Sequence, residues 1–273
     1  MTAMMTTEVV SPEDRTAFAE TAVARSGMYR LLAEVLAYPS PAPAEAVRTG
    51  EFHRELATFA AYLPPQPNED AALRELCMEG LRRRDAAHGE VTEDGLSEDY
   101  SDVFGHALSR DCPPYETEYA GAHIFLQSQE LADIGGFYAA YGLAIDVASH
   151  ERLDHISPQL EFMHVLCERE AYALNNDRDE QAEACSQTQG QFIEDHLGRW
   201  GTYFAQLLAK RGAGTVYGHI APILEWFLSW ETEYLDATPD LVTEIQAGAE
   251  PEDDEEQSDM GMESADWVGD MTQ

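Results

Sequence analysis

The sequence has almost no lysine. Its 273 residues include 16 basic side chains, and all of these except Lys210 are arginines. They face 52 acidic residues, which gives a formal net charge of -36 at pH 7. Proteins that bind nucleic acid neutralise its phosphates with lysine and arginine. Nucleic acid is therefore excluded as an expected partner.

Cysteine is also scarce and scattered. The four cysteines, Cys77, Cys112, Cys167 and Cys185, form no Cys-x-x-Cys pair. Disulfide frameworks and zinc sites both depend on cysteines in recognisable spacings. The pattern predicts reduced thiols in a cytoplasmic protein and no metal site built on cysteine.

Long apolar runs are missing as well. Residues 1–14 have neither the basic region nor the apolar stretch of a signal peptide. The longest apolar region, residues 215–230, is interrupted by His219, Pro222 and Glu225 and is too short to cross a bilayer. We therefore expect no export by a signal of its own, no membrane span and a cytoplasmic location.

The acidity is spread over the whole chain. Residues 236–273 contain thirteen acidic residues and no basic one, yet the preceding 235 residues still carry 39 acidic against 16 basic residues. Such self-repulsion weakens a compact state at ordinary ionic strength, whereas at molar salt the screening length falls to about 3 Å. We therefore expect a salt-rich cytoplasm, as in a halophile.

Apolar residues recur at three- and four-residue spacing along almost the whole chain, without a convincing β-type alternation. The fold class is therefore predicted to be all-α. One clear apolar stripe runs from Leu160 through Met163 and Cys167 to Leu174. Other helices are expected at about 12–37, 42–62, 69–87, 96–107, 117–140, 179–197, 200–211 and 217–235.

Two starting points are open for the helix that contains Leu160. Ser157 and Pro158 suit the N-cap and the first helical position. Asp154 would instead cap the helix one turn earlier. The sequence does not decide between them.

The chain divides into three parts. Residues 1–11 are expected to be a flexible N-terminus, residues 12–236 the helical domain, and residues 237–273 an acidic disordered tail. Local docking of the tail through Met260, Met262, Trp267 and Val268 stays open. Residues 146–158 separate an N-terminal from a C-terminal helical portion and are predicted to be a hinge.

Three motifs lie in the middle of the chain. They read Tyr-Ser-Asp-Val-Phe at 100–104, Pro-Tyr-Glu-Thr-Glu-Tyr at 114–119 and Asp-His-Ile-Ser-Pro-Gln-Leu-Glu-Phe-Met at 154–163. In composition, order and spacing they resemble the TorD/DmsD/NarJ family of cytoplasmic chaperones for molybdenum-containing redox enzymes. The resemblance covers about residues 20 to 235. Gln159 departs from the pattern, because the family often has a carboxylate there.

The resemblance implies a function without catalysis. It implies a single helical bundle-like domain that binds the precursor of a molybdopterin-dependent oxidoreductase catalytic subunit and the twin-arginine signal peptide of that precursor. The chaperone would assist cofactor loading, assembly and export. Exchange of helical portions at the hinge would be a route to a homodimer. No cofactor is expected, although guanine-nucleotide binding, sometimes attributed to the family, stays open.

Helical spacing places Tyr100, Val103 and Phe104 on one face, and Tyr115 and Tyr119 on another. Taken singly, each of these residues is more often part of a core. The resemblance instead implies that they bind the client. The implied client-binding residues are Tyr100, Val103, Phe104, Pro114, Tyr115, Glu116 and Tyr119.

A groove lined by Phe104, Tyr115 and Tyr119 would accept the apolar part of the signal peptide. Its arginines would be attracted by Glu116, Glu118, Asp99 and Asp102. The hinge residues implied by the third motif are Asp154, His155, Pro158 and Gln159.

His155 raises the question of catalysis. A small helical hydrolase that uses His155 with a neighbouring carboxylate is one alternative function, and a structural adaptor subunit is another. Side chains of adjacent residues such as Asp154 and His155 project in different directions, and no Gly-x-Ser-x-Gly motif supplies a nucleophile. We therefore expect no catalytic residue.

Metal and nucleotide motifs are incomplete. His150 and His155 are five residues apart, one more than in His-Glu-x-x-His. The glycines of residues 212–218 lack the dinucleotide-binding spacing, and the chain has no Gly-Lys-Ser/Thr. We expect neither a bound metal nor a dinucleotide.

Overall fold

The structure is a computed structural model that describes residues 11–82, 91–105, 111–119, 124–145 and 151–245. These residues form helices and connecting loops, and within them no β-strand occurs, which confirms the all-α prediction. The helices are α1 (Pro12–Leu36), α2 (Pro41–Thr49), α3 (Glu51–Tyr62), α4 (Ala71–Arg82), α5 (Glu93–Phe104), α6 (Ile124–Ala140), α7 (Ile156–Asn175), α8 (Asp179–Phe192), α9 (Gly198–Arg211) and α10 (Val216–Tyr234).

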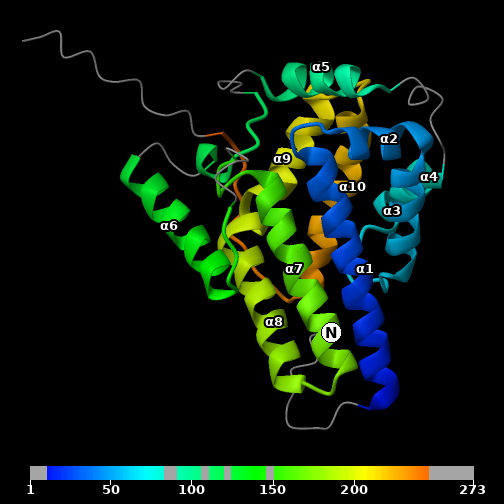
Figure 1. Ribbon diagram of the computed structural model, residues 1–273, viewed down its shortest axis with the longest axis vertical. Coiled ribbons are helices and arrows are strands. Elements are labelled where there is room, and N and C mark those ends of the chain that lie inside the picture. Colours follow the sequence, from blue (N-terminus) through cyan, green and yellow to red (C-terminus); the bar gives the residue numbers. More distant parts are fainter. Residues whose placement is uncertain (1–10, 83–90, 106–110, 120–123, 146–150, 246–273) are drawn as a thin grey trace, which may run out of the picture.

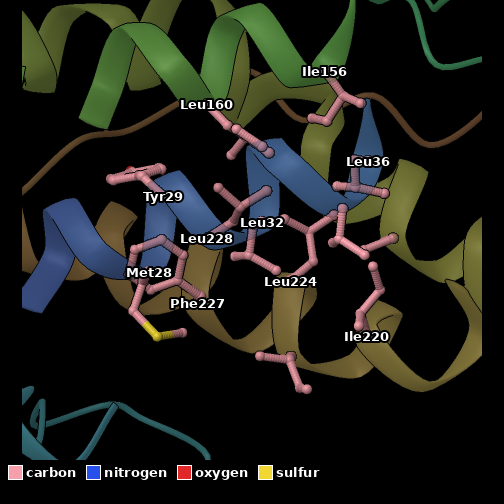
Figure 2. Packing of buried hydrophobic residues seen from close by; sticks show 14 of the residues in the cluster. Met28, Tyr29, Leu32, Leu36, Ile156, Leu160, Ile220, Leu224, Phe227 and Leu228 are labelled. Atoms are coloured by element: carbon pink, nitrogen blue, oxygen red, sulfur yellow. The ribbon is translucent and has the colours of Figure 1, made fainter. Parts of the chain in front are cut away.

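Helices α1 and α7 run side by side through the middle of the bundle (Figure 1). Helix α8 lies on one side of them, α2 to α4 lie on the other, and α5 crosses one end. Side chains of α1, α7 and α10 interleave in the core (Figure 2). The residues labelled there are Met28, Tyr29, Leu32, Leu36, Ile156, Leu160, Ile220, Leu224, Phe227 and Leu228, all buried.

Local signals explain where α1 begins. The side chain of Ser11 accepts a hydrogen bond from the backbone N–H of Asp14, and Pro12 occupies the first turn, where its missing N–H costs nothing. Glu13 and Asp14 add negative charge at the positive end of the helix dipole.

Several predicted helices differ from the structure. The helix expected at 42–62 is divided at Gly50, whose φ of 71° is left-handed and ends α2. The helix expected at 117–140 begins only at Ile124, because residues Glu116–Glu118 form a short 3-10 turn, η2. The helices expected at 179–197 and 200–211 are instead joined by a π-helical segment, η4 (Ile193–Leu197).

The C-terminal region continues beyond α10. Residues 236–245, which the sequence assigned largely to the tail, return along α9, where the N–H of Val242 donates to the carbonyl of Arg199 at 2.9 Å. Val242 and Ile245 pack against the core. The rest of the predicted tail, 246–273, lies outside the described residues, as do residues 1–10 of the predicted N-terminus and 146–150 of the predicted hinge.

A buried charge network links four helices. Arg25 on α1 donates to both carboxylate oxygens of Glu231 on α10, each at 2.7 Å, and to Glu170 on α7 at 3.0 Å. It also donates to Gln189 on α8. Arg25 and Glu231 are both fully buried. These bonds therefore fix the relative positions of α1, α7, α8 and α10.

All four cysteines are buried and form no disulfide bond, as predicted. None of the helices in the described part of the chain is both long and apolar enough to span a membrane.

Candidate functional site

The second and third motifs lie against each other although about forty residues separate them. The N–H of Glu116 donates to the carbonyl of Asp154, and the N–H of Ile156 donates to the carbonyl of Pro114, each at 2.9 Å. Tyr115 and His155 thereby form an isolated antiparallel bridge. The start of α7 is thus tied to the loop that carries the 3-10 turn.

Asp154 holds this junction through its side chain. Its fully buried carboxylate accepts hydrogen bonds from the backbone N–H of Thr117 at 3.2 Å and from the hydroxyl of Thr117 at 2.7 Å. Arg152 donates to both oxygens, through Nε at 2.9 Å and Nη2 at 2.8 Å. The carboxylate of Asp154 is therefore hydrogen-bonded to residues of the protein itself.

His155, rather than Ser157 or Asp154, is the N-cap of α7, so both predicted starting points were wrong. Its Nδ1 accepts a hydrogen bond from the N–H of Ser157 at 3.1 Å. An imidazole satisfies this position because its unprotonated nitrogen is an acceptor, as a serine or aspartate oxygen would be.

His155 is held in its neutral form. Burial, together with the nearby charge of Arg152, lowers its pKa to about 3. Since Nδ1 is an acceptor, the proton is on Nε2, which faces the hydroxyl of Tyr100 at 3.3 Å. Asp154 is bonded to Thr117 and Arg152, and Glu151 lies 3.9 Å from Nδ1, beyond hydrogen-bond distance, so neither carboxylate orients the imidazole. This arrangement gives the hydrolase alternative no support.

Glu116 is not placed at the surface, contrary to its expected part in attracting arginines. Its carboxylate is only 2% exposed, lies 3.0 Å from Nδ1 of His196, and accepts a hydrogen bond from Gln159. Gln159 also accepts from the indole N–H of Trp200 at 3.2 Å. A carboxylate at position 159 would face Glu116, so the departure from the family pattern at Gln159 fits this pairing.

No motif in the sequence marks His196. The π-helical segment η4 places it in the core, and π turns are often found at functional sites. Burial lowers its pKa, but the hydrogen bond and charge of Glu116 outweigh this and raise the pKa above its ordinary value. Its other nitrogen, Nε2, lies 3.3 Å from Asp133 on α6. Because His196 belongs to no recognisable motif, its pairing with Glu116 could not be predicted from the sequence.

Most of the predicted client-binding residues are interior. Phe104 is 4% and Tyr119 1% exposed, and Val103 and Pro114 are buried beside them. Tyr119 donates its hydroxyl to the carbonyl of Pro113 and packs on Trp200. Two of the three rings that were predicted to line a groove, Phe104 and Tyr119, are therefore part of the core.

Tyr115 and Tyr119 do not share a helical face, since they flank a 3-10 turn. The ring of Tyr115 packs against His155 instead. Tyr100 and Phe104 do share a face, with ring centroids 4.6 Å apart.

Three tyrosines remain accessible next to the junction. Tyr38, which no motif marked, is 61% exposed and packs edge-on against the half-buried Tyr100 at 5.4 Å. Tyr115 is half-buried and lies close enough to Tyr100 to raise the pKa of its hydroxyl. We call Tyr38, Tyr100 and Tyr115 the tyrosine surface.

Carboxylates border the tyrosine surface. A depression of about 450 Å³ beside Tyr38 is lined by Glu98 and Asp102 together with two serines. The pKa of Tyr100 is raised by burial and by the charge of Glu151. Burial and the neighbouring charges of Asp102 and Glu98 also raise the pKa of Asp99. Aromatic faces next to carboxylates are suited to guanidinium groups.

Comparison with known proteins identifies the family. The family model described as nitrate reductase delta subunit matches residues 51–206, which is more than half of the chain. The chain belongs to this family. The resemblance to the TorD/DmsD/NarJ chaperones is thereby confirmed.

Curated relatives of this chain are named as chaperones. The perchlorate reductase assembly chaperone protein of Dechloromonas aromatica is 27% identical over 187 residues, which cover 65% of this chain and 75% of the relative. The chaperone protein TorD of Photobacterium profundum is 27% identical over 188 residues, or 68% of this chain and 83% of the relative. TorD of Vibrio atlanticus is 26% identical over 140 residues, or 51% and 64%. These relatives are chaperones, and this family membership confirms that the chain is not an enzyme.

The burial of His155 should make the free energy of unfolding of this protein depend on pH. Its folded pKa lies below its unfolded value, so its contribution is present above about pH 6.5 and is lost as the pH falls towards its folded pKa. As the pH falls from 6.5 to 5, the free energy of unfolding should fall by about 2 kcal/mol more in the parent protein than in His155→Asn, whose amide oxygen keeps the N-cap. Urea unfolding at both pH values measures this.

His164→Asn is the matched control, because it removes a partly buried histidine from the same helix. The control should keep the pH dependence of the parent protein. Identical pH dependence in the parent and in His155→Asn would contradict a neutral buried His155.

Proposed function

We propose that this protein is a cytoplasmic chaperone that binds the precursor of a molybdopterin-dependent oxidoreductase catalytic subunit. It holds the apo form until the cofactor is loaded, and then releases it for assembly and export. Family membership supports this proposal, as do relatives named as chaperones, one of them a perchlorate reductase assembly chaperone. Selectivity for the immature client follows if the apo form exposes surface that the mature enzyme buries.

We further propose that the tyrosine surface binds the twin-arginine signal peptide of the client. The observation that carries this proposal is the set of accessible tyrosines bordered by Glu98, Asp102 and Glu151. Tyrosine faces and carboxylates together bind guanidinium groups by stacking and charge-assisted hydrogen bonds.

The interior residues have a supporting part in this proposal. Val103, Phe104, Pro114 and Tyr119 lie in the core behind the tyrosine surface and hold it in place. The buried pair of Glu116 and Gln159, with Asp154 and His155, fixes the junction to α7. Pro158, in the first turn of α7, belongs to the same junction. Movement at this junction would open the groove or exchange helical portions in a homodimer.

The signal-peptide proposal predicts the effect of removing a tyrosine. Tyr100→Ala and Tyr115→Ala should each weaken binding of a synthetic twin-arginine peptide about fivefold to thirtyfold, since truncating an aromatic anchor costs about 1–2 kcal/mol. Isothermal titration calorimetry measures the affinity.

Tyr172→Ala is the control, because Tyr172 is an exposed tyrosine on the distant part of α7. It should leave the affinity unchanged. If both Tyr100→Ala and Tyr115→Ala bound the peptide as tightly as the parent protein, the tyrosine surface would not be the signal-peptide site.

A further inference from the structure

Arg152 lies beside the tyrosine surface, stacked on a tyrosine ring and hydrogen-bonded to a carboxylate. Its guanidinium carbon is 4.2 Å from the centre of the Tyr115 ring. Its edge donates to both carboxylate oxygens of Asp154, and Nη2 also donates to the hydroxyl of Thr117 at 2.8 Å. Glu118 lies 3.8 Å away. One aromatic face, two carboxylates and a hydroxyl thus surround one guanidinium.

These contacts define a complete guanidinium site. A stacked ring fixes the plane of the group, and a carboxylate that accepts two parallel N–H bonds fixes its edge. Lysine would satisfy neither requirement, because its ammonium is a compact point charge. The ligand class is therefore a guanidinium, as on an arginine side chain.

Part of the hydrogen bonding of Asp154 does not depend on the occupant. Without Arg152, this carboxylate would keep the backbone N–H and the hydroxyl of Thr117 as donors. The side chain of Arg152 is also 44% exposed, so it covers the site from the solvent side. Its departure would uncover the face of Tyr115.

We infer that Arg152 is a built-in occupant of an arginine-binding site and that an arginine of the client takes its place. This inference rests on the proposed function and deepens it, because it names a residue that sets the affinity for arginine-bearing segments. A client must displace Arg152, so weakly matching segments are rejected. The site itself consists of Tyr115, Asp154, Thr117 and Glu118.

The site can be tested without any client. In Arg152→Ala, N-acetylargininamide should fill the vacated site and raise the melting temperature by about 1–2 °C at a few times its Kd. N-acetyllysinamide should not. The parent protein should respond to neither compound, and neither should Arg178→Ala, which removes another arginine stacked on a tyrosine. Equal responses of Arg152→Ala to the two compounds would overturn the inference.

The exchange is tested with a twin-arginine peptide. Arg152→Ala should bind it about threefold to tenfold more tightly than the parent protein, since a site that is free only a third to a tenth of the time weakens apparent affinity by that factor. The double variant Arg152→Ala with Asp154→Asn should lose this gain. Arg152→Lys, which keeps the charge if the alanine variant folds poorly, should show a smaller gain.

The outcomes separate the two proposals. If the parent protein binds the peptide and a folded Arg152→Ala binds it equally or less tightly, Arg152 is not an occupant that the client displaces, and the proposed function stands. If N-acetylargininamide fills the site in Arg152→Ala but no form of the protein binds the peptide, the guanidinium site stands and signal-peptide binding fails. If neither ligand binds any form, both proposals fail.

Discussion

Replacing Arg25 with alanine is expected to destabilise the folded protein by about 3–5 kcal/mol, because breaking a buried ion pair leaves an uncompensated buried charge. Arg25 is fully buried, and so is its partner Glu231. Glu170 and Gln189 would lose their bonds to the same guanidinium.

The carboxylate of Glu231 would respond to the loss. Burial already raises its pKa, and the charge of Arg25 opposes that shift. Without Arg25 the pKa should rise further, so Glu231 would become protonated at a higher pH. Part of the lost stability should therefore return in Arg25→Ala with Glu231→Gln, which removes the unpaired charge.

Urea unfolding at pH 7 measures this effect. Arg30→Ala is the matched control, since Arg30 lies on the same helix and pairs with Glu34 and Glu55 at the surface. The control should cost no more than about 1 kcal/mol. A similar small cost for Arg25→Ala would show that the buried network does not hold the four helices together.

The melting temperature is expected to rise by on the order of 10 °C between low and molar KCl. The net charge of -36 repels itself in the compact state, and salt shortens the screening length from about 10 Å at 0.1 M to about 3 Å at 1 M. Relief of about 3–4 kcal/mol corresponds to a shift of this size for a chain of about this length. Differential scanning fluorimetry across a KCl series measures it.

A variant ending at Ile245 provides the control for the tail. Most of the negative charge precedes this residue, so the truncated protein should keep most of the salt dependence. A melting temperature that stayed level or fell with KCl in the full chain would refute adaptation to a salt-rich cytoplasm.

Much of the fold could be predicted from helical periodicity, because the apolar stripes of α1, α7 and α10 are long and regular. The positions at which helices are interrupted were harder to predict. Gly50 divides a predicted helix through its left-handed backbone, and the 3-10 turn at Glu116–Glu118 depends on pairing with residues near Asp154. Such long-range backbone pairing leaves no periodic signal.

The motifs located the candidate site but not the roles within it. Glu116 is buried because His196 and Gln159 come from distant elements to pair with it. Tyr119 is interior because Trp200 packs on it. Tyr38 reaches the surface next to Tyr100 from a loop more than sixty residues away. The sequence showed which residue types gather here, whereas three-dimensional packing decides which are accessible.

The most direct test of the account is binding to two forms of one client. The protein would be mixed with a molybdopterin oxidoreductase of its own organism, once as the apo precursor with its signal peptide and once as the mature, cofactor-loaded enzyme, and complexes would be measured by size-exclusion chromatography with light scattering. We predict a complex with the apo precursor and none with the mature enzyme. Equal binding to both forms, or no binding to the precursor, would contradict the account.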